Sequence, residues 1–156
     1  MATLTTTITE EITLNGSDRG STNTLSVGSV TQIFNRIVTC PSGQDTTIAS
    51  FKAAVNTSDG ALKIADAKYI RVTNLSSDDV AMSLQVSLAE NGTADSSASV
   101  LLGAGTSFIL GGVDAGIAVS DANDSIIVAG SLKDLESIII DGHGSNAVNI
   151  EVFVAS

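Results

Sequence analysis

Hydrophobic and polar residues alternate along several short stretches of the chain, which is the pattern of β-strands with one buried face. The clearest stretch is 80–88, where every second residue is apolar: Val80, Met82, Leu84, Val86 and Leu88. Another strand is expected at 69–75, and the Asn, Ser and Asp residues of 74–79 are typical of a turn. We therefore interpret 68–88 as a β-hairpin.

Similar patterns predict strands in the rest of the chain, at 30–38, 46–55, 100–102, 106–110, 125–128, 135–140 and 147–154. The last two would form a hairpin through the polar turn 141–146, and 61–67 fits one helical turn or an irregular segment. About nine or ten short strands at this spacing predict an all-β fold, either an antiparallel β-sandwich or a jelly roll. No repeat or break in composition suggests a second domain.

The N-terminal segment differs from the rest because Thr, Ser, Asn and Gly dominate it. Only Ile8, Ile12 and Leu14 can anchor a strand near 7–14, and 15–24 has almost nothing apolar to bury, which favours a loop or an arm. We therefore expect an N-terminal arm with a first strand over 1–29 and the sandwich over 30–156.

The strand predicted at 30–38 has apolar residues on both faces, so it is either covered on both sides or part of an interface. Ile33, Phe34 and Ile37 are the candidate hydrophobic anchors of a contact between subunits. The alternative is that these three side chains fill the core.

Composition and charge limit the classes of function that this chain can have. Hydrophobic residues make up 43% of the chain and only five residues are aromatic, which favours a core of aliphatic side chains in sheets. The net charge of −10 argues against nucleic-acid binding. Neither a signal peptide nor a run long enough to span a membrane is present, so we expect no membrane partner and synthesis in a cytoplasm. A single cysteine excludes an internal disulfide.

The residues needed for enzyme chemistry are scarce. His143 is the only histidine and lies between two glycines in a predicted turn, and Cys40 is interpreted as a small hydrophobic residue. One His and one Cys cannot form a zinc site. The acidic turns 78–79 and 121–124 offer oxygen ligands but do not match a calcium-binding loop, so solvated turn acids are favoured. We expect no catalytic residues, no metal and no cofactor.

Several segments together resemble small virion proteins of tailed bacteriophages, particularly marine cyanophages. The resemblance rests on DAKYIRVTNLS (66–76), the alternating strand after it, LLGAGTSFIL (101–110), LESIIID (135–141) and the closing strand NIEVFVAS (149–156). It covers 68–156 better than the first 67 residues, and it identifies no functional residue. It implies a β-sandwich or jelly roll that coats a capsid or builds a tail or neck.

The role that this resemblance implies first is capsid decoration, or cement. Such a protein would bind the major capsid protein on the outer capsid surface of the virion, as a homotrimer made in the host cytoplasm. Two alternatives stay open. One is a structural protein of the tail, neck or fibre, and the other is a surface module that binds a receptor or glycan.

Overall fold

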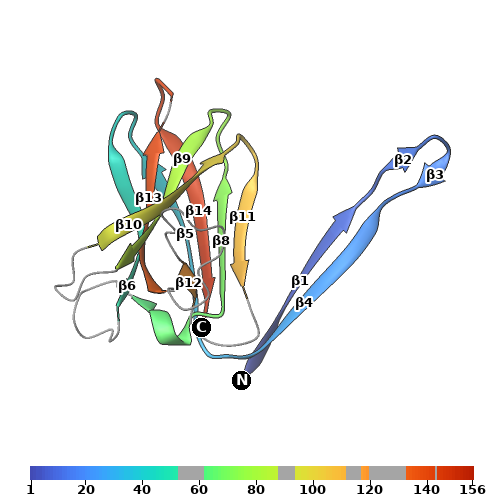
Figure 1. Ribbon diagram of the computed structural model, residues 1–156, viewed down its shortest axis with the longest axis horizontal. Helices are drawn as coiled ribbons and strands as arrows, with labels where there is room; N and C mark the ends of the chain where they lie inside the picture. Colours follow the sequence, from blue (N-terminus) through green and yellow to red (C-terminus); the bar gives the residue numbers. More distant parts are fainter. Residues whose placement is uncertain (53–61, 88–93, 112–116, 120–132, 143) are drawn as a thin grey trace.

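Two β-sheets and a protruding ribbon make up the computed structural model of the chain. The structure describes residues 1–52, 62–87, 94–111, 117–119, 133–142 and 144–156. The sheets pack face to face, and the N-terminal ribbon projects away from them (Figure 1). The predicted all-β fold, an antiparallel β-sandwich, is confirmed.

The larger sheet has the order β10-β9-β13-β6-β7, and β12 also pairs with β13. Its strands are β10 (Ala94–Leu102), β9 (Val80–Ser87), β13 (Lys133–Gly142), β6 (Asp45–Lys52), β7 (Leu62–Lys63) and β12 (Ala118–Val119). A short 3-10 helix, η2 (Ile64–Asp66), follows β7. All these strand pairs are antiparallel except β6 with β7.

The smaller sheet has the order β11-β8-β14-β5 and is fully antiparallel. Its strands are β11 (Ser107–Gly111), β8 (Tyr69–Asn74), β14 (Val148–Ala155) and β5 (Ile33–Cys40). The predicted strand at 30–38 is therefore displaced to 33–40. Within the described residues β5 is an edge strand, because it pairs with β14 on one side only.

The core between the sheets is aliphatic, as the composition predicts. Alternate residues of β9 point into it, and all four described members of the predicted series are buried: Val80, Met82, Leu84 and Val86. Alternate residues of β14 meet them from the smaller sheet, with Val148, Ile150, Val152 and Val154 also buried. The period of two thus identifies the buried face of both strands.

The predicted hairpins are wrong, although their strands are present. β8 pairs with β11 and β14, whereas β9 pairs with β10 and β13, so the turn 75–79 crosses from one sheet to the other. β13 and β14 also belong to different sheets. A short polar turn fits a hairpin and an inter-sheet connection equally well, which is why the local sequence did not separate them.

Asn74, at the end of β8, holds this connection together. Its side-chain amide donates to the backbone oxygens of Asp78 at 2.8 Å and Leu102 at 3.2 Å, and its side-chain oxygen accepts from the Ser76 N–H at 3.0 Å. Asn74 is fully buried and is the one buried polar residue among the described positions. Its side chain satisfies backbone groups that the turn between the sheets would otherwise leave unpaired.

The N-terminal arm is a β-ribbon, so the loop or arm expected at 15–24 includes paired strand residues. β1 (Ala2–Glu10) pairs antiparallel with β4 (Ser21–Val30), and β2 (Thr13–Leu14) pairs with β3 (Ser17–Asp18) at the tip. Asn15 and Gly16 join β2 to β3 and both have positive φ, of 52° and 76°. An Asn-Gly pair with two positive φ values is the favoured two-residue hairpin turn.

Candidate functional site

The arm is amphipathic, and the lower part of its apolar face packs on the sandwich. Leu4, Thr6 and Ile8 of β1 share one face with their β4 partners, while Thr5, Thr7, Thr9 and the residues opposite them form a Thr- and Ser-rich face. Near the base, Leu4 and Leu25 pack against a buried cluster of Val27, Val30, Tyr69 and Ala155. This cluster attaches the arm to the smaller sheet.

An irregularity in β4 sets the base of the arm. The pairing register shifts between Ala2 and Leu4, opposite Gly28 and Ser29, and Ser29 has a positive φ of 56°. The Lys68 ammonium group donates to the backbone oxygens of Gly28 and Ser29, both at 3.1 Å. Lys68 therefore binds two carbonyl groups that the bulge removes from the strand ladder.

Replacing Lys68 by Met is expected to loosen the base of the arm, because both carbonyl groups lose their charged donor. Hydrogen exchange of the backbone amides in β1 and β4 should become about fivefold faster, corresponding to roughly 1 kcal/mol. Lys63→Met is the matched control, since the Lys63 ammonium contacts Asp66 at 3.0 Å and not the arm. Equal exchange rates in the two variants would contradict the role given to Lys68.

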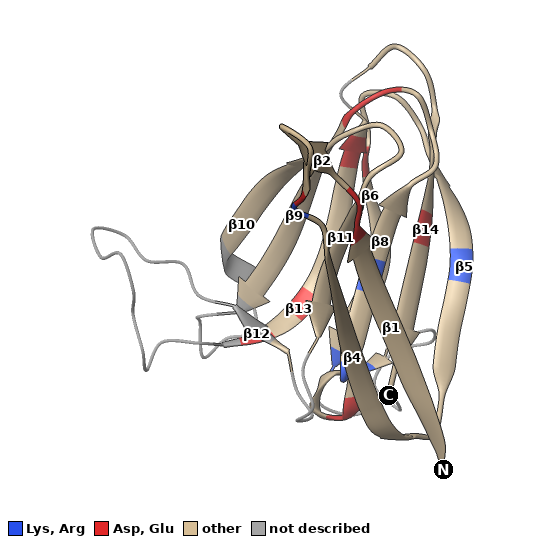
Figure 2. Cartoon of the chain, turned by 90° about the vertical axis from the view of Figure 1, so that its right-hand side faces the viewer, with Lys and Arg blue, Asp and Glu red and all other residues tan. Residues whose placement is uncertain are grey.

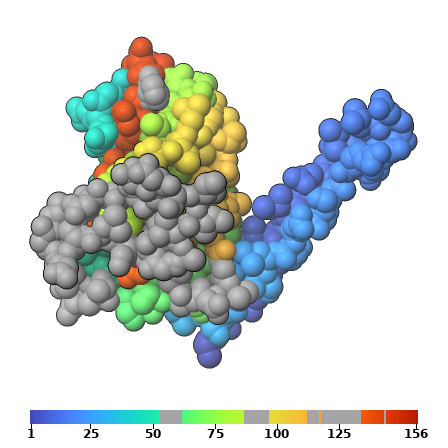
Figure 3. Space-filling model, viewed as in Figure 1, coloured from blue at the N-terminus to red at the C-terminus, as the bar shows by residue number. Residues whose placement is uncertain are grey.

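The outer half of the arm is largely exposed, although Ile8 also lines the hollow between β1 and the smaller sheet. Ile8, Ile12 and Leu14 are 48%, 54% and 57% exposed. In the space-filling view the outer arm stands clear of the rest of the molecule (Figure 3). These side chains therefore form an apolar surface, the outer-arm surface, on a ribbon that is itself held firmly at its base.

The three predicted interface residues lie on β5. Ile33 and Ile37 point outward and are 60% and 61% exposed, so neither fills the core. Phe34 points the other way, is half-buried and packs against the core, with the Arg36 guanidinium 5.3 Å from its ring centre. One face of this strand is thus exposed at Ile33 and Ile37, and the other face packs against the core at Phe34.

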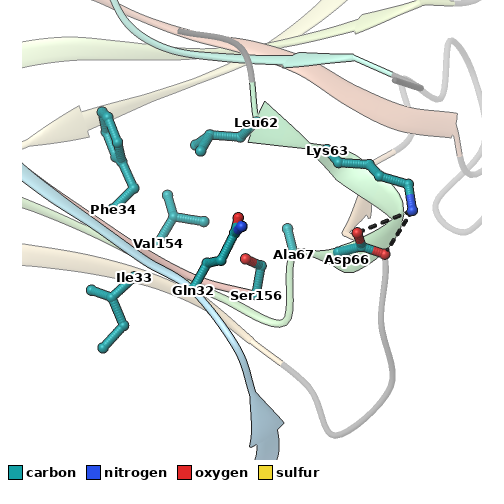
Figure 4. Close-up of a pocket in the computed structure, with 9 residues that line it drawn as sticks. All are labelled: Gln32, Ile33, Phe34, Leu62, Lys63, Asp66, Ala67, Val154 and Ser156. Carbon is teal, nitrogen blue, oxygen red and sulfur yellow. Dashed lines mark hydrogen bonds and ion pairs between the residues drawn. The ribbon is translucent and has the colours of Figure 1, made fainter. Parts of the chain in front are cut away.

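A cleft lies beside β5, where the two sheets are open to each other. It has a volume of about 460 Å³ and runs from Phe34 and Val154 of the smaller sheet to Leu62 and Ala67. Figure 4 shows Phe34, Leu62 and Val154 directed into this space, with Ile33 on the other side of β5. The cleft is lined mainly by apolar side chains, and its charged rim is the Lys63–Asp66 ion pair.

A second hollow lies between β1 and the outer face of the smaller sheet, which Figure 2 views with the ribbon in front. Its volume is about 370 Å³. On the sheet side the Arg71 guanidinium donates to the Glu151 carboxylate at 2.7 Å and lies 5.8 Å from the centre of the Phe153 ring. Because the Arg71 guanidinium and the Glu151 carboxylate form an ion pair, neither contributes an unpaired charge to the hollow.

The remaining candidates for chemistry in the sequence are the acidic turns and His143. No group of three or more His, Cys, Asp or Glu side chains that could hold a metal occurs in the described ranges. The Asp78 carboxylate accepts from the Asn146 amide at 3.1 Å, and the Asp79 carboxylate accepts from the Ala104 N–H at 2.9 Å. Both acids therefore stabilise turns. His143 and the acidic turn 121–124 lie outside the described residues.

Cys40 is fully buried at the end of β5, as expected for a small hydrophobic residue. Burial raises the pKa of the Cys40 thiol, and a hydrogen bond with the Thr46 side chain lowers it by less. We expect the native thiol to react at pH 8 about 100-fold more slowly with a thiol reagent than the unfolded chain does. Absorbance assays with and without urea measure this ratio, and equal rates would contradict the burial of Cys40.

Comparison with known proteins adds little to this geometry. No protein-family model matches the chain, and no curated protein matches it. One solved chain is similar, from work described as "Bacillus endospore appendages form a novel family of disulfide-linked pili". The two chains are 14% identical, the match covers 82% of this chain and 91% of the other, and the TM-score is 0.35. Such a score establishes neither fold nor function. Within the described residues, no helix has the length and apolar character needed to cross a bilayer.

Proposed function

We propose that this chain is a structural virion protein that decorates the outer surface of a tailed-phage capsid and stabilises the shell. The phage assignment rests on the resemblance of 68–156 to small virion proteins. The observation that carries the structural role is the outer-arm surface, where Ile8, Ile12 and Leu14 are exposed on an anchored ribbon. Several exposed large apolar residues on one projecting element favour a contact with another protein.

The geometry of the arm and of β5 supports the role of an assembly subunit. The arm extends the reach of a small sandwich, and its base is fixed by the apolar cluster around Val27 and by the Lys68 hydrogen bonds. The edge strand β5 adds a second exposed apolar surface at Ile33 and Ile37. The proposed partners are the major capsid protein and further copies of this chain, with a homotrimer as the proposed oligomer.

Copy number in purified virions tests the proposal. Quantitative mass spectrometry should find this chain at a copy number of the same order as that of the major capsid protein, because a shell protein follows the shell's symmetry. A copy number far below that value would favour the tail, neck or fibre alternative. Absence from virions would contradict the proposed function.

A further inference from the structure

We propose that the outer arm of one copy docks on the β5 edge of a second copy. The inference deepens the proposed function and rests on the part of it that makes this chain an assembly subunit. It assigns an occupant to the surface around Ile33 and Ile37, and it gives the outer-arm surface a partner other than the shell.

Exposed large apolar side chains are concentrated on the outer arm and on β5. Eight large hydrophobic residues are exposed in the described part of the chain: Met1, Ile8, Ile12, Leu14, Ile33, Ile37, Leu75 and Leu101. Five of these eight lie on the outer arm or on β5. If the outer arm cannot reach β5 of its own molecule, the two apolar surfaces can contact each other only when they belong to different copies.

The link between the arm and the sandwich is fixed by backbone hydrogen bonds. Thr31 and Gln32 connect β4 to β5, and both N–H groups donate to the Ser156 backbone oxygen, at 2.7 and 2.9 Å. The Ser156 N–H in turn donates to the Gln32 oxygen at 3.0 Å. With the Lys68 bonds and the apolar cluster, these contacts hold the arm pointing away from its own β5 (Figure 1).

The two strand edges also match. The outer half of β1 and the eight-residue β5 each have one unpaired edge within the described residues, whereas the inner end of β1, at Leu4, packs on its own sandwich. A strand added to β5 would place alternate side chains over Ile33 and Ile37 and over the cleft beside Phe34 and Leu62. The alternation of Ile8 with threonines in β1 meets this need, because threonine is small and β-branched.

Charge is also complementary at the two surfaces. Glu10 and Glu11 lie where β1 gives way to the tip of the arm, and Arg36 is the only charged residue of β5 and is exposed. Asp18 and Arg19 at the tip leave the ribbon with a net negative charge, so its acidic residues meet a basic position on the Phe34 face of the acceptor strand. The same contact can close a ring of copies, since each molecule carries one arm and one β5 edge.

Light scattering after size exclusion tests the inference on the full-length protein. The wild type is expected to be an oligomer at micromolar concentration. The arm variant Ile8→Ser/Ile12→Ser and the edge variant Ile33→Ser/Ile37→Ser should each be folded and monomeric, with association weakened about 100-fold. Leu101→Ser is the matched control, because Leu101 is 67% exposed on β10, and it should keep the wild-type mass.

Mixing the two monomeric variants gives the sharpest result. The arm variant keeps an intact β5 edge and the edge variant keeps an intact arm, so an equimolar mixture should form a 1:1 heterodimer. A mixture that stays monomeric would overturn the inference, since contacts between two arms or between two β5 edges are not restored by mixing. Ile37→Thr replaces the edge variant if the double substitution unfolds.

Failure of the inference can be told apart from failure of the proposed function. A monomeric wild type would overturn the inference. If the arm variant of such a monomer also failed to bind purified capsids, the arm would contact a shell subunit and not a second copy of this chain. An oligomer that needs both surfaces would support the inference. This support would hold even if the chain were absent from virions, because that absence would contradict only the proposed capsid decoration.

Discussion

Replacing Asn74 by Asp is expected to lower the free energy of unfolding by about 3 kcal/mol or more at neutral pH. The Asn74 amide donates to two backbone oxygens, of Asp78 and Leu102, and a carboxylate of the same shape would face both with no proton to give. Because the site is fully buried, the new charge would also lose its hydration. Urea denaturation at one fixed protein concentration measures the loss.

The pH dependence of the Asn74→Asp variant follows from the same geometry. Burial against carbonyl oxygens should raise the folded-state pKa of the introduced carboxyl group above its unfolded value. The destabilisation is then smallest below the unfolded pKa and grows as pH rises through the raised folded pKa. Asn35→Asp, on the exposed face of β5, is the control and should change stability by about 0.5 kcal/mol or less. Equal losses in the two variants would contradict the structural role of Asn74.

Replacing Ile138 by Ala is expected to cost about 3 to 4 kcal/mol. Ile138 is fully buried in β13, the strand between β9 and β6, and its removal leaves a cavity in the middle of the larger sheet. Thermal or urea denaturation of the folded variant gives the value.

The neighbouring residue supplies the control for this prediction. Ile139 lies on the opposite face of β13 and is only half-buried, so Ile139→Ala should cost about 1 kcal/mol. A larger loss for Ile139 than for Ile138 would mean that the face of β13 assigned to the core is wrong.

The alternating patterns predicted the sandwich because burial on one face of a strand leaves a period of two in the sequence. They did not predict which strands pair. The turn 75–79 has the same composition whether it closes a hairpin or crosses between sheets, and the deciding group is the buried side chain of Asn74, whose partners include the distant residue Leu102. Long-range hydrogen bonds of this kind leave no local pattern.

The secondary structure of the N-terminal arm was also predicted incompletely. Its Thr- and Ser-rich sequence predicted a loop or an arm with one strand because few residues could be buried, and it did not predict that the arm is a two-stranded ribbon whose base packs on Tyr69 and Ala155 of the smaller sheet. The turn Asn15–Gly16 was a signal that could have identified the ribbon from the sequence.

The candidate interface was predicted in part. Apolar residues on both faces of the strand identified Ile33, Phe34 and Ile37, but the sequence could not say that Ile33 and Ile37 are uncovered while Phe34 packs against the core. Exposure depends on β5 being an edge strand, which is a property of the whole sheet order. Their role in assembly stays a prediction.

Cryo-electron microscopy of intact virions tests most directly the proposal that this chain is a subunit of a virion surface. We expect density of this sandwich on the outer capsid surface, in closed groups whose arms reach the β5 edges of adjacent copies. Density confined to the tail or neck, or no density at all, would contradict the proposal.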